Sequence, residues 1–480
     1  MPPRRPLPDV DLISVLKFLK PMDQLVASKM SPRLRLLVRA ANRRVKTLVI
    51  TDVWDDFDPE DTIDSFFISS LPILQQVTDD SGKAIDLQPK AVRANQWNCL
   101  EFEKNCHEEL PTVEEIATVL FSAVTTLVFI MKDGGDDFFY ENCQYLVSLL
   151  QHPHWATTQL QSLVLQLSGD FECTETMASG TYQLVTALNA LSALQQLAVD
   201  FAFWFHIDDE HLPVLPALTV LAQLKVLVVK LGVGQVETAF FLDAIASQAA
   251  DNADLQIHLQ WSSIGPTCTV NDFAHWSEAL LSRVVSLEDY QSLLERRTVE
   301  EMPCRLFPSL TSLTLSVNDS FSTNYRLWTT ALSSQNLRQL LHLSWSLFLK
   351  DPQNVDRSLI ETPPPRGSLP RLTSVRALTL SLHLNDHSQA EWMHLPWTLP
   401  NCQVIYLQNF TCRRCDVRLC FLRFGRYHTE HSEPTAKSAA ALQCLREFLF
   451  KLYPYFPHRQ IILDFDDPKY PTVAELFAEQ

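Results

Sequence analysis

Cysteine and histidine residues gather in the last quarter of the chain at a spacing that could bind zinc. The cluster comprises Cys412, Cys415, Cys420, His428 and His431. Thiolate and imidazole are the ligands of structural zinc sites, but a zinc finger separates its two histidines by three to five residues, and His428 and His431 are closer than that. Gly425 also stands where a finger needs a large apolar residue. The sequence favours a loop with reduced cysteines and no metal over the alternative of a zinc finger.

Acidic runs suggest acid–base chemistry but lack the groups that would complete it. Neither 208–210 nor 464–467 has a matching base, nucleophile or phosphate-binding loop, so a solvated surface is the simpler interpretation. Only 10 glycines occur in the 480 residues, and the glycine-rich nucleotide motifs, G-x-S-x-G and H-E-x-x-H are all missing. We expect a non-catalytic protein without a cofactor.

Composition and apolar patterning predict a folded protein outside the membrane. Hydrophobic residues make up 46% of the chain and charged residues 20%, as in ordinary globular proteins. The longest strongly apolar stretch, 116–131, is shorter than the ~20 residues that a helical span needs. The 11 cysteines are mostly scattered and the first residues lack a secretory pattern, which favours reduced thiols. We therefore expect the cytoplasm or the nucleus.

The charge of the chain is divided unevenly. Residues 1–50 hold 11 basic and 3 acidic residues, a net charge of +8, whereas the remaining 430 carry 28 against 53, a net charge of −25. The acidic body would repel nucleic acid, which opposes the hypothesis of a zinc-dependent nucleic-acid binder, while the basic head could contact an acidic partner.

The first 46 residues predict three short helices. Asp9 can cap a helix that ends where Lys20 precedes a proline, a second helix begins near Asp23, and Ser31 with Pro32 starts a third. The first and third carry apolar residues at helical spacing. A unit this small supports only a limited core, so we expect it to pack against the larger body of the chain.

This head resembles an F-box over residues 5–46, with a Leu-Pro start, a helix of the form L-x-x-V-L-x-F-L, a proline and then Asp-x-Leu. The resemblance implies that the head docks on a Skp-type adaptor of a cullin ubiquitin ligase, and such adaptors are acidic as a family. It implies that the adaptor-binding residues are Leu7, Pro8, Leu12, Val15, Leu16, Leu19, Pro21 and Leu25.

The body repeats the pattern apolar-x-x-apolar-x-apolar. Strong copies centre on residues 48, 127, 163, 197, 227, 313, 378 and 405, with weaker ones near Ile257, Leu340 and Ile461. Two intervals, from 257 to 313 and from 405 to 461, are about double the others, as though one strand had been lost or replaced. Helical stretches are expected at 140–151, 177–190, 236–248, 273–297 and 435–453.

Strands and helices that alternate at about 30 residues predict an α/β solenoid, in which each unit is stable only when stacked on its neighbours. The pattern resembles leucine-rich repeats, although the asparagine expected just past each strand survives only as Asn318. We therefore expect an α/β protein: a three-helix head over 1–46, then an irregular leucine-rich-repeat horseshoe over 47–480. Loop insertions are expected at about 52–115, with 75–115 irregular, and at 350–370. A non-repeat α/β domain is the alternative.

Polar residues between the buried strand leucines should face the concave side, and the aromatic run at 201–205 follows one strand directly, where it could anchor a partner. The candidate substrate-binding residues are Asp200, Trp204, Lys230, Ser316, His383, Tyr406 and Gln408.

Two functions fit these patterns. In the first, the chain is the substrate-recognition subunit of a Skp–cullin–F-box ubiquitin ligase: the head docks the adaptor, and the repeats bind a protein target that the sequence cannot name. In the second, it is a repeat scaffold unrelated to ubiquitin, whose first helices only cap the solenoid. They differ in whether the apolar stripe of the first helix is available to a partner.

Overall fold

In a computed structural model, the chain divides into two compact units: residues 1–58 with 90–256, and residues 59–89 with 257–480. The described residues are 9–52, 99–104, 110–120, 124–132, 136–153, 160–168, 175–200, 216–231, 235–261, 270–289, 305–317, 339–347, 372–384, 399–412, 417–420, 443 and 460–463.

Three helices form the head, as expected. They are α1 (Asp9–Leu16), α2 (Pro21–Met30) and α3 (Pro32–Ala41). Ser31 caps α3 by accepting a hydrogen bond from the Leu34 amide, and Pro32 occupies the first helical position, where its missing N–H costs nothing. The buried apolar residues of these helices are Leu16, Leu25, Leu37 and Val38.

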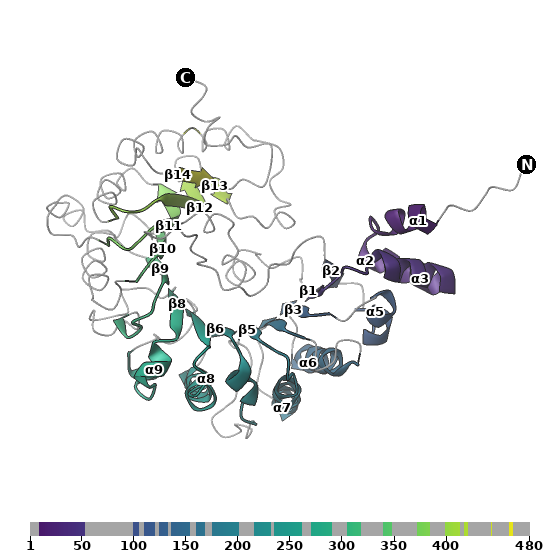
Figure 1. Cartoon of the computed structure of the whole chain (residues 1–480), viewed down its shortest axis with the longest axis horizontal. Helices are drawn as coiled ribbons and strands as arrows, with labels where there is room; N and C mark the ends of the chain where they lie inside the picture. Colours follow the sequence, from purple (N-terminus) through teal and green to yellow (C-terminus); the bar gives the residue numbers. More distant parts are fainter. Residues whose placement is uncertain are drawn as a thin grey trace, which may run out of the picture. The chain divides into compact units, whose positions relative to one another are not determined.

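The rest of the first unit is a parallel sheet with helices on one side (Figure 1). Its strands, in spatial order, are β2 (Cys99–Lys104), β1 (Thr47–Asp52), β3 (Thr126–Lys132), β4 (Ser162–Ser168), β5 (Gln196–Asp200) and β6 (Val226–Leu231). The helices are α5 (Val113–Val119), α6 (Asp136–Gln151), α7 (Glu175–Asn189) and α8 (Gln235–Gln248), with a 3₁₀ turn, η5, at Thr219–Gln223.

One leucine of each main strand lies beside the leucine of the next. This row is buried throughout and consists of Leu48, Leu127, Leu163, Leu197 and Leu227. Adjacent strands are also joined at their starts: the Gln161 carbonyl accepts hydrogen bonds from the amides of Gln195 and Gln196, and the Gln195 carbonyl accepts from the next strand in the same way. Stacking of near-identical units thus supplies both the core and the backbone partners.

The second unit repeats this arrangement. Its parallel strands are β7 (Gln256–Trp261, whose first residue belongs to the first unit), β8 (Val284–Asp289), β9 (Ser312–Val317), β10 (His342–Leu347), β11 (Ala377–Leu384) and β12 (Val404–Cys412). Beside β12 lie β13 (Val417–Cys420), antiparallel to its second half, and β14 (Gln460–Leu463), parallel to its first half. A short helix α9 (Glu278–Leu281) and a 3₁₀ turn η6 (Val270–Phe273) precede β8.

Amide side chains tie neighbouring repeats of the first unit together. Asn252 donates to the carbonyls of Leu221 and Leu224 at 3.2 and 2.6 Å, and Gln223 donates to the Leu191 carbonyl at 2.6 Å. Each bond satisfies a turn carbonyl of the preceding repeat. These bridging amides lie just before a strand, whereas the repeat pattern led us to expect an asparagine just after each strand.

The predicted fold class is confirmed: a packed three-helix head is followed by alternating strands and helices with a parallel, leucine-rich-repeat-like sheet. One predicted helix is wrong. The stretch 273–297 contains only α9 and then strand β8 among its described residues, so the first doubled interval contains a strand: Leu287 pairs with Leu259 on one side and Leu313 on the other. In the second doubled interval, β14 lies directly beside β12.

Other details of the repeat assignment change. In two of the weaker copies of the repeat pattern, the residue that lies in the leucine row is Leu259 rather than Ile257, and Leu343 rather than Leu340. Part of the stretch 75–115 that we expected to be irregular forms β2 and the start of α5. The predicted loop at 350–370 lies outside the described residues, as does nearly all of the predicted helix at 435–453.

Candidate functional site

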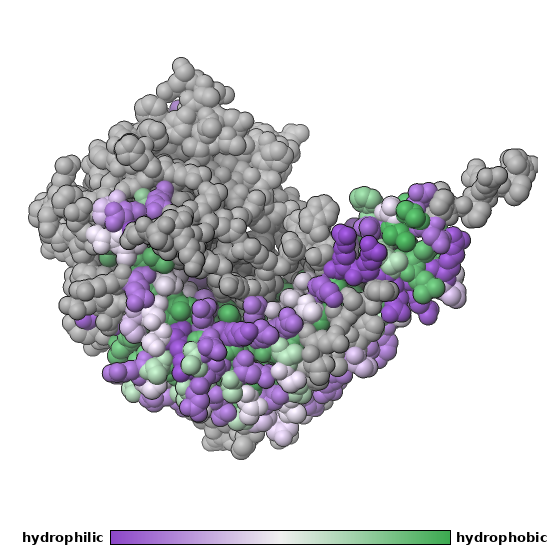
Figure 2. Space-filling view, viewed as in Figure 1, coloured by the Kyte–Doolittle hydropathy of each residue, from purple (hydrophilic) through white to green (hydrophobic). Residues whose placement is uncertain are grey.

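Large apolar side chains are exposed on the head. Among the described residues, the exposed large apolar side chains are Val10 (73%), Val15 (53%), Phe18 (89%), Val26 (58%), Met30 (73%), Leu36 (67%) and Tyr182 (51%). All but Tyr182, on α7, belong to the head. Figure 2 shows this apolar surface in green beside polar side chains. Monomeric proteins rarely leave neighbouring large apolar residues uncovered, so the head is the first candidate site.

Helix α1 is the least covered part of the head. Leu16 is its one buried residue, at 4% exposed, while Leu12 and Ile13 are half-buried. Phe18 follows the helix in a turn held by hydrogen bonds from the Phe18 and Leu19 amides to the carbonyls of Val15 and Leu16. A helix with so little burial contributes little to the fold of the head, which leaves its apolar side for a partner.

The eight adaptor-binding residues suggested by the sequence differ in how exposed they are. Val15 is exposed, and Leu12, Leu19 and Pro21 are half-buried. Leu16 and Leu25 are buried inside the head, so their side chains do not reach its surface. Leu7 and Pro8 lie outside the described residues. The sequence stripe did not single out the exposed residues Val10, Phe18, Val26, Met30 and Leu36, because most lie off the i, i+3, i+4 pattern.

Basic residues accompany this apolar surface. The exposed ones are Lys17, Lys20, Lys29, Arg33, Arg35, Arg43, Arg44 and Lys46. Arg33 pairs with Asp9 and thereby links α3 to the start of α1. The head therefore presents apolar and positive groups together, which would complement an acidic apolar surface.

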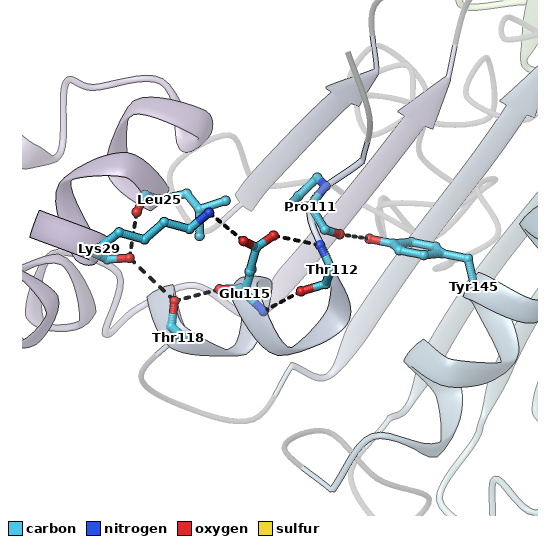
Figure 3. Close-up of polar contacts among 8 residues, drawn as sticks. Leu25, Lys29, Pro111, Thr112, Glu115, Thr118 and Tyr145 are labelled. Carbon is cyan, nitrogen blue, oxygen red and sulfur yellow. Dashed lines mark hydrogen bonds and ion pairs between the residues drawn. The ribbon is translucent and has the colours of Figure 1, made fainter.

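Helix α2 of the head packs on α5 (Figure 3). Lys29 of α2 forms an ion pair with Glu115, and the Ser28 hydroxyl lies 3.5 Å from that of Thr118. Glu115 also closes a capping box, because its carboxylate accepts from the Thr112 amide while the Thr112 hydroxyl accepts from the Glu115 amide. The hydrogen bond from Lys29 and then that from Thr112 lower the pKa of Glu115.

Tyr145 extends this contact from α5 to α6. Its hydroxyl donates a 2.6 Å hydrogen bond to the Pro111 carbonyl, just before the capping box (Figure 3). Burial, and next the nearby carboxylates of Glu115 and Glu114, raise the pKa of Tyr145, so it remains a donor. The head is thus joined to the repeats through α5.

The sheet face opposite the leucine rows, here called the second face, changes character between the units. In the first unit its row is apolar and no more than 9% exposed: Val49, Val128, Val164, Ala198 and Val228. The corresponding row in the second unit is mostly polar: Gln260, Glu288, Thr314, Ser344, Thr379 and Tyr406. Gln260 is 4% exposed, so this row differs from the valines in its polarity and not in greater exposure at that residue.

The predicted substrate-binding residues lie on this face in two groups. Asp200 and Lys230 are register partners on β5 and β6 in the first unit. Ser316, His383 and Tyr406 occupy second-face positions on β9, β11 and β12 in the second unit. Trp204 lies outside the described residues.

A β-bulge changes one of these positions. The register of β11 and β12 shifts after Leu380, so Gln408 is the extra residue and Asn409 pairs with Ser381. Bulges re-aim the residues that come after them. Asn409, rather than Gln408, therefore lies on the second face after the bulge. The sequence could not predict this, because a single inserted residue leaves no clear signal in an apolar pattern.

Two histidines are buried on the second face of the second unit. His342 shares a 2.9 Å hydrogen bond between its Nδ1 and the Ser312 hydroxyl on the neighbouring strand. Within the described part of the chain, His258 has no hydrogen-bond partner at either ring nitrogen. Burial lowers the pKa of each histidine to about 4, so both are neutral at pH 7.

The cysteine–histidine cluster is only partly described. Cys412 ends β12 and Cys420 ends β13, at opposite ends of their short antiparallel ladder. Cys415, His428 and His431 lie outside the described residues. Among the side chains that the structure places, no three metal-binding groups come together.

Comparison of the sequence with models of protein families and with curated proteins finds no match. Within the described ranges, no helix is both long and apolar enough to cross a bilayer.

Proposed function

We propose that this chain is the substrate-recognition subunit of a Skp–cullin–F-box ubiquitin ligase. The observation behind this proposal is the uncovered apolar surface of a basic three-helix head, with Phe18 at 89% exposed beside the thinly buried α1. The F-box resemblance over residues 5–46 says which kind of partner would cover such a surface.

In this function the head and the repeats do separate tasks. An acidic Skp-type adaptor covers the apolar residues of the head, and the exposed basic residues favour its approach. The repeats hold a protein target, for which the polar second face of the second unit is the better candidate. The chain contributes no catalytic group and requires no metal or cofactor. It acts in the cytoplasm or the nucleus by raising the local concentration of target lysines near a charged ubiquitin carrier.

The second candidate function is a repeat scaffold in which the head only caps the sheet. The packing of α2 and α3 on α5 favours it, because a cap needs such a contact. A pure cap, however, has no use for an exposed Val15 on α1 and an exposed Phe18 in the turn that follows it. The two functions therefore differ in the fate of α1 when an adaptor is present.

The test is co-expression with a Skp-type adaptor, followed by size-exclusion chromatography. The variant is Val15→Asp/Phe18→Asp, because both side chains are exposed and their replacement leaves the head core intact. Leu16→Asp would be uninformative, since a buried charge would unfold the head. Tyr182→Asp is the matched control, an exposed apolar residue on α7.

We expect the wild type and the Tyr182→Asp variant to elute with the adaptor and the double variant to elute alone. A folded wild-type chain that elutes alone would rule out the ligase function and leave the scaffold. Co-elution of all three proteins would show that the adaptor binds somewhere other than α1.

A further inference from the structure

Four elements of the first unit meet at one buried pair of amide side chains. Gln24 of α2 is 4% exposed and Asn42, which follows α3, is 5% exposed. The Asn42 Nδ2 donates to the Gln24 Oε1 at 2.8 Å and to the carbonyl of Val119, the last residue of α5, at 3.0 Å. The Gln24 Nε2 donates to the carbonyls of Leu16 and Leu19 at 3.0 and 3.1 Å. One connected relay therefore runs from α1 through α2 and α3 to α5.

Each side-chain N–H of this relay has a partner. The two N–H groups of Gln24 donate to the carbonyls of Leu16, the last residue of α1, and of Leu19, in the turn that follows α1. Those of Asn42 divide between α2 and α5. Another hydrogen bond from a side chain to a backbone carbonyl joins α3 to the end of α5: the Arg39 Nε donates to the Leu120 carbonyl at 3.0 Å.

The amides at this position do more than stabilise the head. Apolar groups of the same shape could replace the bond between Gln24 and Asn42 at little cost in stability, although the carbonyls of Leu16, Leu19 and Val119 would then lose a partner. Apolar side chains, however, allow neighbouring helices to slide, whereas hydrogen bonds to fixed carbonyls are satisfied in one arrangement. The two amides therefore favour one orientation of the head on α5 over others. The exposed Lys29–Glu115 ion pair is too solvated to do this alone.

We infer that Gln24 and Asn42 are positioning residues: they hold the head in one orientation on the repeat sheet of the first unit and so set how a bound adaptor lies relative to that sheet. This inference rests on the proposed function for its biological meaning, but the orientation itself can be measured without any partner.

The experiment measures one distance in the full-length chain. A ketone-bearing residue that accepts a nitroxide label replaces Lys17, just after α1, and Gln144 on α6; both are exposed. Double electron–electron resonance then reports the distance distribution between head and repeats. The variants are Gln24→Leu/Asn42→Leu and Asn42→Ala; the second removes the hydrogen bond of the relay to α5 but keeps the bonds from Gln24 to the carbonyls of Leu16 and Leu19. Asn252→Leu is the matched control, an amide bracket between repeats away from the head.

We expect one narrow distance in the wild type and in the Asn252→Leu variant, and loss of that single peak in both relay variants. A single narrow peak that survives in both relay variants would overturn the inference, because another contact would then orient the head. Adaptor binding is assayed on the same proteins. If the wild type does not bind the adaptor, the proposed function fails, while the distance measurement still decides whether the relay orients the head.

Discussion

Phe18 offers the sharpest single-residue test of the adaptor-binding surface. Its side chain is 89% exposed, in the turn that follows α1. Truncation to alanine removes nothing from the core of the head, so the free energy of unfolding should change by less than about 0.5 kcal/mol. Any large effect on a complex must therefore come from the interface.

The size of that effect can be worked out from the area. A phenylalanine side chain buries ~150–250 Å² when covered, and apolar burial is worth ~25 cal/mol per Å². Covering a ring that is 89% exposed in the free chain is thus worth roughly 3–6 kcal/mol, before the costs of association are subtracted. Hot-spot residues reach about 2–4 kcal/mol, so Phe18→Ala should weaken adaptor binding by ~30-fold to ~1000-fold.

Isothermal titration calorimetry with a purified Skp-type adaptor measures this directly. Tyr182→Ala is the control, because it removes an exposed aromatic ring from α7 and should leave the dissociation constant unchanged. If the Phe18→Ala dissociation constant stays within about threefold of wild type while thermal stability is unchanged, the adaptor does not cover the exposed ring and the predicted interface is wrong.

Three further predictions concern stability. His258 and His342 have a pKa of about 4 in the fold against an ordinary 6.5, so the unfolded chain takes up protons first as the pH falls. The stability that the neutral histidines contribute is complete above pH 6.5 and is lost toward pH 4, by ~3 kcal/mol for each histidine. Urea unfolding at pH 7 and at pH 4 should show this loss. Glutamine at either position should reduce the loss. Asn252→Ala should cost ~1–3 kcal/mol in the same assay, because it orphans two turn carbonyls. Glu115→Gln should cost less than ~1 kcal/mol at pH 7, and the difference from wild type should vanish as the pH falls from 4.5 through the lowered pKa of Glu115.

The repeat pattern was predictable because it depends on local periodicity. Leu163, Leu197 and Leu227 could be aligned from the sequence because each lies in the same short apolar frame, and the structure places them in one row. Strand β8 was missed because its neighbours carry helical spacing and α9 occupies part of the interval. The doubled spacing was the remaining signal of that strand.

The site was less predictable because exposure is a tertiary property. Val15 and Leu16 are adjacent and equally apolar, yet one is 53% exposed and the other 4%. The contact between Asn42 and Val119 joins residues 77 positions apart, across an insertion, and no local pattern predicts it. The same holds for Asn409, which reaches the second face through a bulge.

Hydrogen–deuterium exchange with and without a Skp-type adaptor would locate the adaptor contact on the chain. If the head binds the adaptor, amide exchange should slow in peptides from residues 9–36 when the adaptor is present, and exchange in peptides from strands β3 to β6 should stay the same. Unchanged exchange throughout the head, or slower exchange confined to the repeats, would show that the three-helix head is not the adaptor-binding site.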